Sequence, residues 1–493
     1  MMDMVKAPLL KGQAPLLKGL LSYHGENNAL FHMPGHKGDP HGILTSILGN
    51  VMKLDVTEVP GTDNLHYPEG ILRESMDLLT RAMRSEESRY LVNGSTGGIL
   101  AMVMGCFRPG DRVLVQRDCH QSVYNAIALS GIQPVFIDPG INEEFGIPTA
   151  IDTETVVKAM SSNPGLRGFI LTSPSYFGVS PDLDGISDIC RSNGMKLLVD
   201  EAHGSHFYFG EDLPVTAMDC GAAASVCSFH KTLPSLTQGS VINLGKGAQE
   251  EDKDRIRHYL RVFQTSSPSY VIMASLEAAR LVMETEGYEL LKCVKSMIDS
   301  LSESIRDIPG IRLLKEADLK GLRKDYTRLV LNTPITGNHL SEVLRRDYGI
   351  QAEMAAGNNI VFLGSCFDDE GMYHRLRDAI IDLDSKGMFS KSLSGRNNSG
   401  TSKLPSPVTM IPEREALFES WEVIAFEQAE GRVCAERITP YPPGVPVLMT
   451  GELVSRDAVE HLMRLEGSGA NILKSRSGGR GTIAVISRNV ENK

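Results

Sequence analysis

Short apolar runs alternate with helix-length segments over residues 88–199, and this alternation constrains the fold more than any other feature of the chain. The expected strands are 88–92, 112–116, 135–137, 168–172 and 196–199, and the expected helices are 97–106, 121–130 and 183–192. Strands separated by helices at this spacing form crossover units and a mostly parallel sheet. The expected fold class is therefore α/β, and functional groups should lie in the loops at the carboxyl ends of the strands.

The rest of the chain divides into smaller units. A chain of 493 residues is too long for one ordinary core, so two or three domains are expected. Helices are expected at 255–263, 274–286, 339–348 and 413–430, strands at 239–244, 311–314, 327–332 and 359–363, and a hairpin turn at 478–481. The predicted boundaries are an N-terminal arm with loops (1–75), a large domain (76–310), a small α+β domain (311–390), a linker (391–407) and a C-terminal domain (408–493).

Composition excludes several classes of protein. The net charge of −11 argues against nucleic acid as the main partner. No apolar run reaches the roughly 18 residues of a membrane span, and no leader pattern opens the chain. The eight cysteines show no CxxC pair, as in reduced proteins of the cytoplasm. A cytoplasmic protein without a membrane partner is expected.

Two N-terminal features carry less weight. The unit APLLKG occurs at 7–12 and again at 14–19, which favours an extended arm or a short helix. His32 and His36 have the spacing of a metal pair on a helix, but Pro34 and Gly35 lie between them. A metal site there is not expected.

A candidate anion site lies between the first expected strand and its helix. The segment Asn93–Gly98 offers backbone N–H groups at a helix start and the hydroxyls of Ser95 and Thr96 beside Gly97. It lacks the lysine of a Walker loop and the GxGxxG of a dinucleotide fold, so neither a nucleoside triphosphate nor NAD is indicated. On its own the hexapeptide fits an ordinary capped helix equally well.

Two further strands end in groups that can do chemistry. His120 follows the strand 112–116 and is either a surface residue or a flat ring that can stack on a planar ligand. Asp200, Glu201 and His203 end the strand 196–199 and could bind a metal, or Asp200 could pair with a protonated ring nitrogen. The neighbouring loops offer no further carboxylates, so a metal site ranks second and none is predicted.

Lys231 completes the set. It lies in SVCSFHKTLPSLTQGSVINL, and alone it reads as a salt-bridging surface lysine or a reactive amine. A phosphate cradle, a stacking histidine, an aspartate at a strand end and a later lysine together suit pyridoxal phosphate, for which lysine and aspartate are the usual partners. The joint pattern is more specific than any of its parts.

The chain also resembles the bacterial ornithine/lysine/arginine decarboxylases of the aspartate-aminotransferase-like fold (fold type I). The resemblance is closest to the shorter members, which lack an N-terminal wing domain. It rests on FHMPGHKG, VTEVPGTDNLHYPEGIL, LVNGSTGG, QRDCHQSVYNAI, LTSPSYFGVSPDL, VDEAHGSHF, SFHKTLPSLTQGS, QTSSPSYVIMASLE and PYPPGVPVLMTGE. It implies that residues 76–310 bind the cofactor.

The resemblance implies a role for each site residue. Lys231 would form the Schiff base, Asp200 would pair with the pyridine nitrogen, and His203 would lie near the substrate. His120 and Ala202 would pack on the two faces of the ring. The phosphate would be held by Ser95, Thr96, Ser228 and His230, and by Thr265 and Ser266 of a neighbouring subunit, since the segment 265–267 would cross to it. A homodimer with shared active sites is thereby implied, with a higher oligomer left open.

The implied reaction is decarboxylation of a basic amino acid. L-Arginine, giving agmatine and CO2, is the first choice by analogy with the shorter members, and lysine and ornithine are alternatives. The distal cation of the substrate needs an acidic recess, for which Glu353, Glu436 and Glu452 are candidates. An aminotransferase, an inactive regulator on the same fold and a metal hydrolase are the competing functions.

Overall fold

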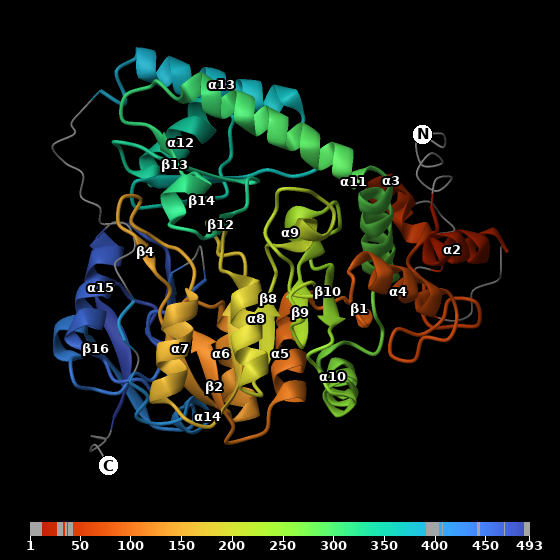
Figure 1. Ribbon diagram of the computed structural model, residues 1–493, viewed down its shortest axis with the longest axis horizontal. Coiled ribbons are helices and arrows are strands. Elements are labelled where there is room, and N and C mark those ends of the chain that lie inside the picture. Colours follow the sequence, from red (N-terminus) through yellow and green to blue (C-terminus); the bar gives the residue numbers. More distant parts are fainter. Residues whose placement is uncertain are drawn as a thin grey trace.

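A computed structural model describes residues 12–26, 33–34, 37, 43–390, 404–406, 408–440, 444–467 and 469–487. Its centre is a seven-stranded sheet of order β1-β10-β9-β8-β6-β2-β3 (Figure 1). These strands are β1 (Glu87–Leu91), β2 (Arg112–Gln116), β3 (Gln133–Ile137), β6 (Leu166–Thr172), β8 (Lys196–Asp200), β9 (Ala224–Cys227) and β10 (Ser240–Leu244). Only β10 runs antiparallel to its neighbours in this sheet. The expected α/β class with a mostly parallel sheet is confirmed.

Helices cover both faces of the central sheet, because each strand points alternate apolar side chains to opposite sides. In β2, Val113 and Val115 join one buried cluster and Leu114 joins the other. The first cluster lies under α5 (Gly94–Cys106), α6 (Gln121–Ser130) and α10 (Glu250–Phe263). The second lies under α4 (Ile71–Ala82), α7 (Thr153–Ser162), α8 (Leu183–Ser192) and the start of α11 (Tyr270–Ile305).

A second, smaller sheet stands above the central one in Figure 1, on the side where α9 (Phe229–Thr232) lies. Its antiparallel order is β11-β13-β15-β14, formed by β11 (Arg312–Leu313), β13 (Arg328–Asn332), β15 (Asn359–Leu363) and β14 (Met354–Ala356). The last turns of α11 pack on it with α12 (Gly337–Tyr348) and α13 (Glu370–Ser385). A short pairing of β12 (Arg323–Lys324) with β7 (Val179–Ser180) joins it to the loops of the central sheet.

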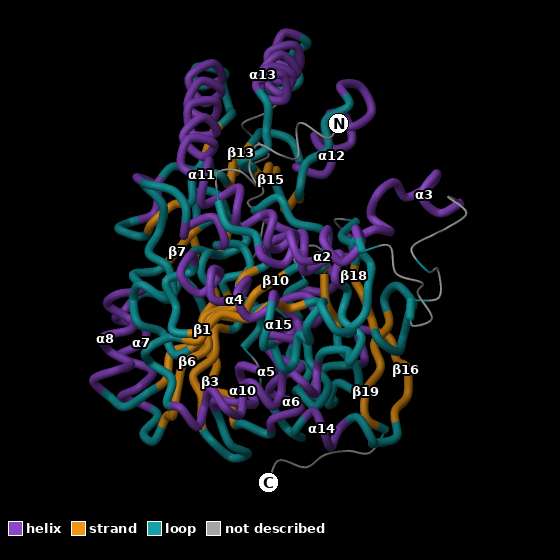
Figure 2. Tube along the Cα trace, turned by 90° about the vertical axis from the view of Figure 1, so that its right-hand side faces the viewer, coloured by secondary structure: helices purple, strands orange, loops and turns teal. Residues whose placement is uncertain are grey.

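Residues 408–487, called the C-terminal segment below, flank the central sheet (Figure 2). The helix expected at 413–430 is wrong: α14 covers only Glu413–Ala416, and β16 (Trp421–Ala425) follows and pairs with β19 (Thr482–Ile486). The partner strand lies about sixty residues away, so local propensity could not reveal it.

The hairpin turn expected at 478–481 is also wrong. The preceding strand, β18 (Ile472–Lys474), pairs with β17 (Ile438–Pro440), whereas β19 pairs with β16. The glycine cluster therefore connects two separate two-stranded sheets. The segment's other helix is α15 (Arg456–Gly467), which packs on its small core.

At the N-terminus, the second APLLKG unit lies largely in α2 (Pro15–Gly25), so the helix alternative holds there. Its first backbone N–H groups, those of Leu16 and Leu17, donate to the carboxylate of Glu277 on α11. Residues 7–11 of the first unit, His32, His36 and most of the expected linker lie outside the described residues. No helix within the described ranges is long and apolar enough to cross a membrane.

The remaining elements are short. They are α3 (Ile43–Leu48), η1 (Gly49–Lys53), β4 (Ile141–Asn142), β5 (Ile147–Pro148), η2 (Ser205–Tyr208), η3 (Glu316–Leu319) and η5 (Phe426–Gln428). The five domain boundaries expected from the sequence stay a prediction.

Candidate active site

The carboxyl edge of the central sheet brings the expected side chains together. Asp200 is the last residue of β8 and lies in register between Thr172 of β6 and Val226 of β9. His120 follows β2, and Lys231 follows β9. β9 and β8 are neighbours, and β2 is separated from β8 only by β6, so these groups lie at the same edge of the sheet.

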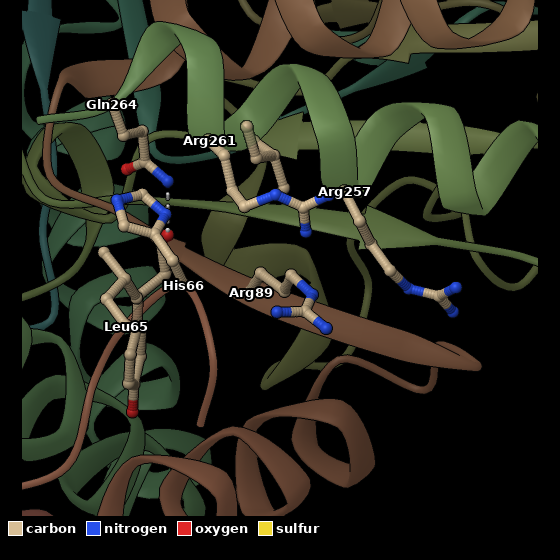
Figure 3. A pocket seen from close by; sticks show the side chains of 8 residues that line it. Leu65, His66, Arg89, Arg257, Arg261 and Gln264 are labelled. Carbon is tan, nitrogen blue, oxygen red and sulfur yellow. Dashed lines mark hydrogen bonds between the residues drawn. The ribbon is translucent and has the colours of Figure 1, made fainter. Parts of the chain in front are cut away.

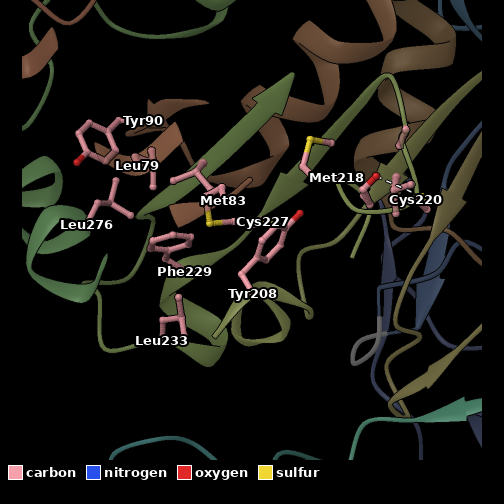
Figure 4. Packing of buried hydrophobic residues seen from close by; sticks show 14 of the residues in the cluster. Leu79, Met83, Tyr90, Tyr208, Met218, Cys220, Cys227, Phe229, Leu233 and Leu276 are labelled. Atoms are coloured by element: carbon pink, nitrogen blue, oxygen red, sulfur yellow. Dashed lines mark hydrogen bonds between the residues drawn. The ribbon is translucent and has the colours of Figure 1, made fainter. Parts of the chain in front are cut away.

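Lys231 is held by the core beneath it. Its helix α9 has only four residues, but Phe229 and Leu233 on either side of the lysine are buried in the cluster with Cys227 and Tyr208 (Figure 4). Burying each such side chain contributes about 1.5–3 kcal/mol, which fixes the short helix in place. Lys231 Nζ lies 3.2 Å from His203 Nε2. Burial lowers the pKa of Lys231, a shift that the charge of Asp200 opposes.

His203 lies between two cationic side chains. Its Nε2 faces Lys231, and its Nδ1 lies 2.5 Å from Nη2 of Arg328. A guanidinium can only donate, so Nδ1 accepts and the imidazole proton belongs on Nε2. Burial, with the charges of Lys231 and Arg328, holds the pKa of His203 well below its usual range. The imidazole is therefore neutral, and its Nε2–H can donate to Lys231 when that amine is unprotonated.

Asp200 and His120 occupy the floor of the site. Asp200 is buried, and its Oδ1 accepts the backbone N–H of Ala202 at 3.1 Å. His120 caps α6: its Nδ1 accepts the N–H of Ser122 at 3.2 Å. Burial lowers the pKa of His120, and the nearby Asp200 opposes that shift. A neutral, fixed imidazole thus lies beside a buried carboxylate.

The start of α5 is an open anion cradle. The side chain of Asn93, at the capping position, does not bond the helix and instead donates to Phe263 O at 2.8 Å. The first-turn N–H groups therefore have no side-chain cap. Gly94 has φ +71°, a left-handed value that favours glycine, and its N–H donates to Gln238 O. Ser95 is half-buried, Thr96 is exposed and Gly97 is buried.

The residues around the cradle fit a phosphorylated pyridine aldehyde. Ser228 Oγ is fully buried and has no hydrogen-bond partner among the described residues, so a polar group is needed to satisfy it. His230 is fixed by its Nδ1, 2.9 Å from Gly239 O. A helix N-terminus for phosphate, a carboxylate for the ring nitrogen and a buried amine for the aldehyde are the donor set of pyridoxal phosphate.

Two side chains at the site were missed from the sequence. Arg328, at the start of β13, is buried, and its Nε and Nη1 have no partner within the described chain. Tyr176 packs edge-on against His203, with ring centroids 4.9 Å apart. Nothing in the sequence distinguishes Arg328 from the other arginines. Tyr176 lies in the expected loop after β6, where its position could have suggested a role.

Of the three acidic candidates for the distal cation, only Glu353 reaches the site. Its Oε1 accepts the hydroxyl of Tyr176 at 2.5 Å, and its charge acts on both Lys231 and Arg328. Glu353 is exposed, so it remains open to a ligand.

The other two candidates, Glu436 and Glu452, are buried and bonded within the fold, not surface charges. Glu436 accepts the backbone N–H groups of Arg476, Ser477 and Ala484. Glu452 accepts the N–H of Met449 and lies 3.6 Å from Arg117. Both are buried. They satisfy backbone and charge inside the fold.

Glu201 is likewise occupied elsewhere. Its two oxygens accept the hydroxyl of Tyr208 and the N–H of Ala217, both at the buried cluster below the sheet edge. Burial raises the pKa of Glu201 to about 7. The metal-hydrolase alternative therefore loses one of its proposed ligands.

A separate small pocket borders the segment 265–267 (Figure 3). It is lined by Leu65, His66, Arg89, Tyr90, Arg257, Leu260, Arg261 and Gln264. Arg89 and Arg257 both pair with Glu87, so two of its three arginines are already compensated. His66 Nε2 lies 2.8 Å from Thr265 O. Thr265 and Ser266 are exposed at its rim.

Comparison with known proteins gives the family. The model of the Orn/Lys/Arg decarboxylase major domain matches residues 14–323, and that of the C-terminal domain matches residues 405–471. An uncharacterized protein of Bacillus subtilis strain 168, YaaO, is 36% identical over 459 residues, covering 92% of this chain and 94% of its own. An arginine decarboxylase of the same organism is 31% identical over 465 residues, covering 92% and 93%.

A solved structure supports the fold. The lysine decarboxylase LdcF of Francisella novicida superimposes with a TM-score of 0.82 at 18% identity, covering 96% of this chain and 81% of its own. At that identity the likeness concerns the fold alone. Together with the two family models and the relatives from Bacillus, it leads to one conclusion: this chain belongs to the Orn/Lys/Arg decarboxylase family.

Proposed function

We propose that the protein converts L-arginine to agmatine and CO2, with lysine and ornithine as alternative substrates. The protein is a pyridoxal-phosphate-dependent amino acid decarboxylase, and the arginine assignment is the step that goes further. It is supported by relatives at 31–32% identity that are arginine decarboxylases, whereas a constitutive lysine decarboxylase of Escherichia coli is 25% identical. The observation that carries the site is the half-buried Lys231 amine, 3.2 Å from His203 and within reach of the charge of Asp200.

The residues of the edge would hold the cofactor as follows. The N–H groups of α5 with Ser95, Thr96 and Gly97 would bind the phosphate, assisted by Ser228 and His230. When bound, pyridoxal phosphate supplies an aldehyde for the substrate amine and a ring that accepts the electrons released at Cα. Asp200 would keep the ring nitrogen protonated, because a nearby negative charge raises the affinity of that nitrogen for its proton. His120 and Ala202 would contact the two ring faces.

The contacts among Arg328, His203 and Lys231 determine which atom carries the transferable proton. Arg328 makes Nδ1 of His203 the acceptor, so the transferable proton is on Nε2, 3.2 Å from Lys231 Nζ. A lysine with a lowered pKa is neutral more often and can act as a nucleophile. After CO2 has left, we propose that His203 Nε2–H or protonated Lys231 returns a proton to Cα.

Glu353 is our proposed contact for the distal guanidinium. A carboxylate pairs with a planar guanidinium through two parallel hydrogen bonds, and Tyr176 holds Glu353 in place for that contact. The unpaired N–H groups of Arg328 are available to the α-carboxylate of the substrate. The two ends of the substrate would then be fixed by two charges of opposite sign.

A homodimer with shared sites is part of the proposal. The segment 265–267 is exposed, and large apolar side chains lie exposed in the segments around it: Tyr67, Leu236 and Val262. Gln264 joins this segment to the end of β1 by accepting the N–H of Val92 at 2.8 Å. The segment is therefore near its own cradle and also open to a second chain. The cytoplasmic location stays a prediction.

One experiment separates the alternatives. The purified protein with pyridoxal phosphate is incubated with arginine, lysine or ornithine, and the amine and keto-acid products are identified. Agmatine with CO2 is expected. Cadaverine or putrescine as the main product would show that lysine or ornithine, not arginine, is the substrate. A keto acid would indicate an aminotransferase. No product with any of the three amino acids would favour the inactive regulator.

A further inference from the structure

The C-terminal segment attaches to the large sheet on both sides of His120. Before it in the chain, Arg117 donates from Nη2 to Val447 O at 3.0 Å and lies 3.6 Å from Glu452. After it, Asn125 on α6 accepts a hydrogen bond of 2.6 Å from Nη1 of Arg437. The ring-stacking candidate thus lies between two attachment points of a distant part of the chain.

The residues between the two attachment points also contact one another. Tyr124 donates its hydroxyl to Arg117 O at 2.6 Å, and the Arg117 guanidinium lies 5.5 Å from the centroid of the Tyr124 ring. His120 itself caps α6 through Ser122. The position of the imidazole is therefore set by α6 and by whatever fixes α6.

Arg437 is the residue of the C-terminal segment that fixes α6, and it carries a positive charge. Its side chain is one-fifth exposed and makes a second bond, from Nη2 to Glu413 at 2.9 Å, that holds the guanidinium rigidly. Its positive charge lowers the pKa of His120 in addition to burial, with Lys231 acting in the same direction and Asp200 opposing.

We propose that Arg437 of the C-terminal segment is a positioning residue for His120: it clamps α6 through Asn125 and holds a positive charge beside the imidazole. The first action sets where the ring lies, and the second keeps it uncharged against the pull of Asp200. The inference rests on the proposed function, because His120 needs a bound cofactor ring on which to stack.

The test compares the holoenzyme with Arg437→Gln and Arg437→Lys. Arg437→Gln removes the charge and shortens the clamp. It should weaken cofactor binding about tenfold, because the loss of one hydrogen bond costs about 1.4 kcal/mol. It should also introduce a pH-dependent change in the cofactor's visible absorbance between about pH 5 and pH 8, where a histidine titrates. Arg437→Lys keeps the charge, so it should restore the flat pH profile but not the affinity.

Arg432→Gln is the matched control. Arg432 bonds Glu422 and Ile486 O within the C-terminal segment and has no bond to α6. The single tryptophan of the chain, Trp421, reports through its fluorescence that this segment is folded in every variant. The control should keep the wild-type absorbance and cofactor affinity.

The proposal is overturned if folded Arg437→Gln keeps the wild-type spectrum and cofactor affinity, or if Arg432→Gln changes both to the same extent. Either result leaves the decarboxylase assignment intact as long as the wild-type protein binds the cofactor and forms an amine. If the wild-type protein binds no cofactor, the proposed function fails, and this inference fails with it.

Discussion

Arg328 donates to the same imidazole that faces Lys231: its Nη2 lies 2.5 Å from Nδ1 of His203. The donor comes from the small sheet and the acceptor from the large one, so the protonation of a catalytic candidate depends on how the two sheets meet. Lys324 supports this contact, because its Nζ donates to the backbone oxygen of Arg328 at 2.6 Å.

Replacing Arg328 should change the pH dependence of the reaction. In Arg328→Gln the cation beside His203 is lost, so the pKa of the imidazole should rise and the acid limb of kcat/KM should move to higher pH. We expect kcat to fall by at least about 100-fold, a typical effect of losing a charged orienting group. Arg323→Gln, on the exposed neighbouring strand β12, should behave as wild type. An unshifted pH profile in Arg328→Gln would contradict the assigned tautomer.

Lys231→Ala should abolish turnover and the visible absorbance of the bound cofactor, because the variant loses the amine that lies 3.2 Å from His203. Reduction of the wild-type protein with borohydride, followed by peptide mass spectrometry, should find the cofactor mass on the peptide that contains Lys231. The control Lys246→Ala, at an exposed position, should retain activity and the cofactor mass on the Lys231 peptide. Steady-state decarboxylation by Lys231→Ala would refute the assignment.

Glu353→Gln should lower kcat/KM for arginine by about 10- to 100-fold, the range for a hydrogen bond to a charged group. Decarboxylation of an analogue with an uncharged side chain should change much less, because Glu353 would have no cation to bind. Glu342→Gln, exposed on α12 of the same unit, serves as the control. Equal losses on both substrates would show that Glu353 acts on folding or on the cofactor instead.

Shared active sites can be tested by complementation. Lys231→Ala and a Thr265→Ala/Ser266→Ala double variant are each expected to be impaired. If the segment 265–267 serves the partner's cradle, co-expressed and differently tagged chains should form mixed dimers with one intact site. Those dimers should regain up to half the wild-type activity of a dimer, measured after tandem purification. Activity no higher than the average of the two parents would show that Thr265 and Ser266 serve their own chain.

The C-terminal segment should lose stability in acid. Burial lowers the pKa of His461 to about 4, below the 6.5 of a free histidine. The folded state therefore resists a proton that the unfolded chain accepts, so this stability is complete above about pH 6.5 and declines as the pH falls towards 4. Urea unfolding followed by Trp421 fluorescence should show a loss of about 2 kcal/mol from pH 7 to pH 5.

His461→Gln should flatten that dependence, whereas His258→Gln, at an exposed position of α10, should leave it unchanged. An equally steep decline in His461→Gln would assign the acid sensitivity to other groups.

Local patterns revealed much of the central fold. β2, α6 and α8 begin and end where the apolar periodicity places them, because each is bounded by polar or turn-forming residues. The helix expected at 274–286 extends to Tyr270–Ile305, because it continues from the core of the large sheet into that of the small one. The strand β16 was mistaken for helix, since only its distant partner β19 identifies it.

The candidate site likewise contains residues that the sequence predicts to meet and residues that it does not. Lys231, Asp200, His120 and His203 all follow strands of one sheet, so the strand order alone predicts that they meet. Arg328 reaches them from β13 of the small sheet, a long-range contact that no local pattern contains, whereas Tyr176 lies in the loop after β6 of the central sheet. Glu353 is one of three acidic candidates in the sequence, and its contact with the hydroxyl of Tyr176 joins it to the site.

The burial of Phe229 and Leu233 has a consequence for how such an enzyme can diversify. Lys231 lies on a short helix whose flanking side chains are buried in the core, so changes at Phe229 or Leu233 should lower the stability of the fold. Glu353 is exposed and lies just before β14 of the small sheet. If Glu353 binds the distal cation as proposed, substrate preference can change by mutation at this position while the residues around Lys231 stay the same, which makes position 353 the natural starting point for engineering new amines.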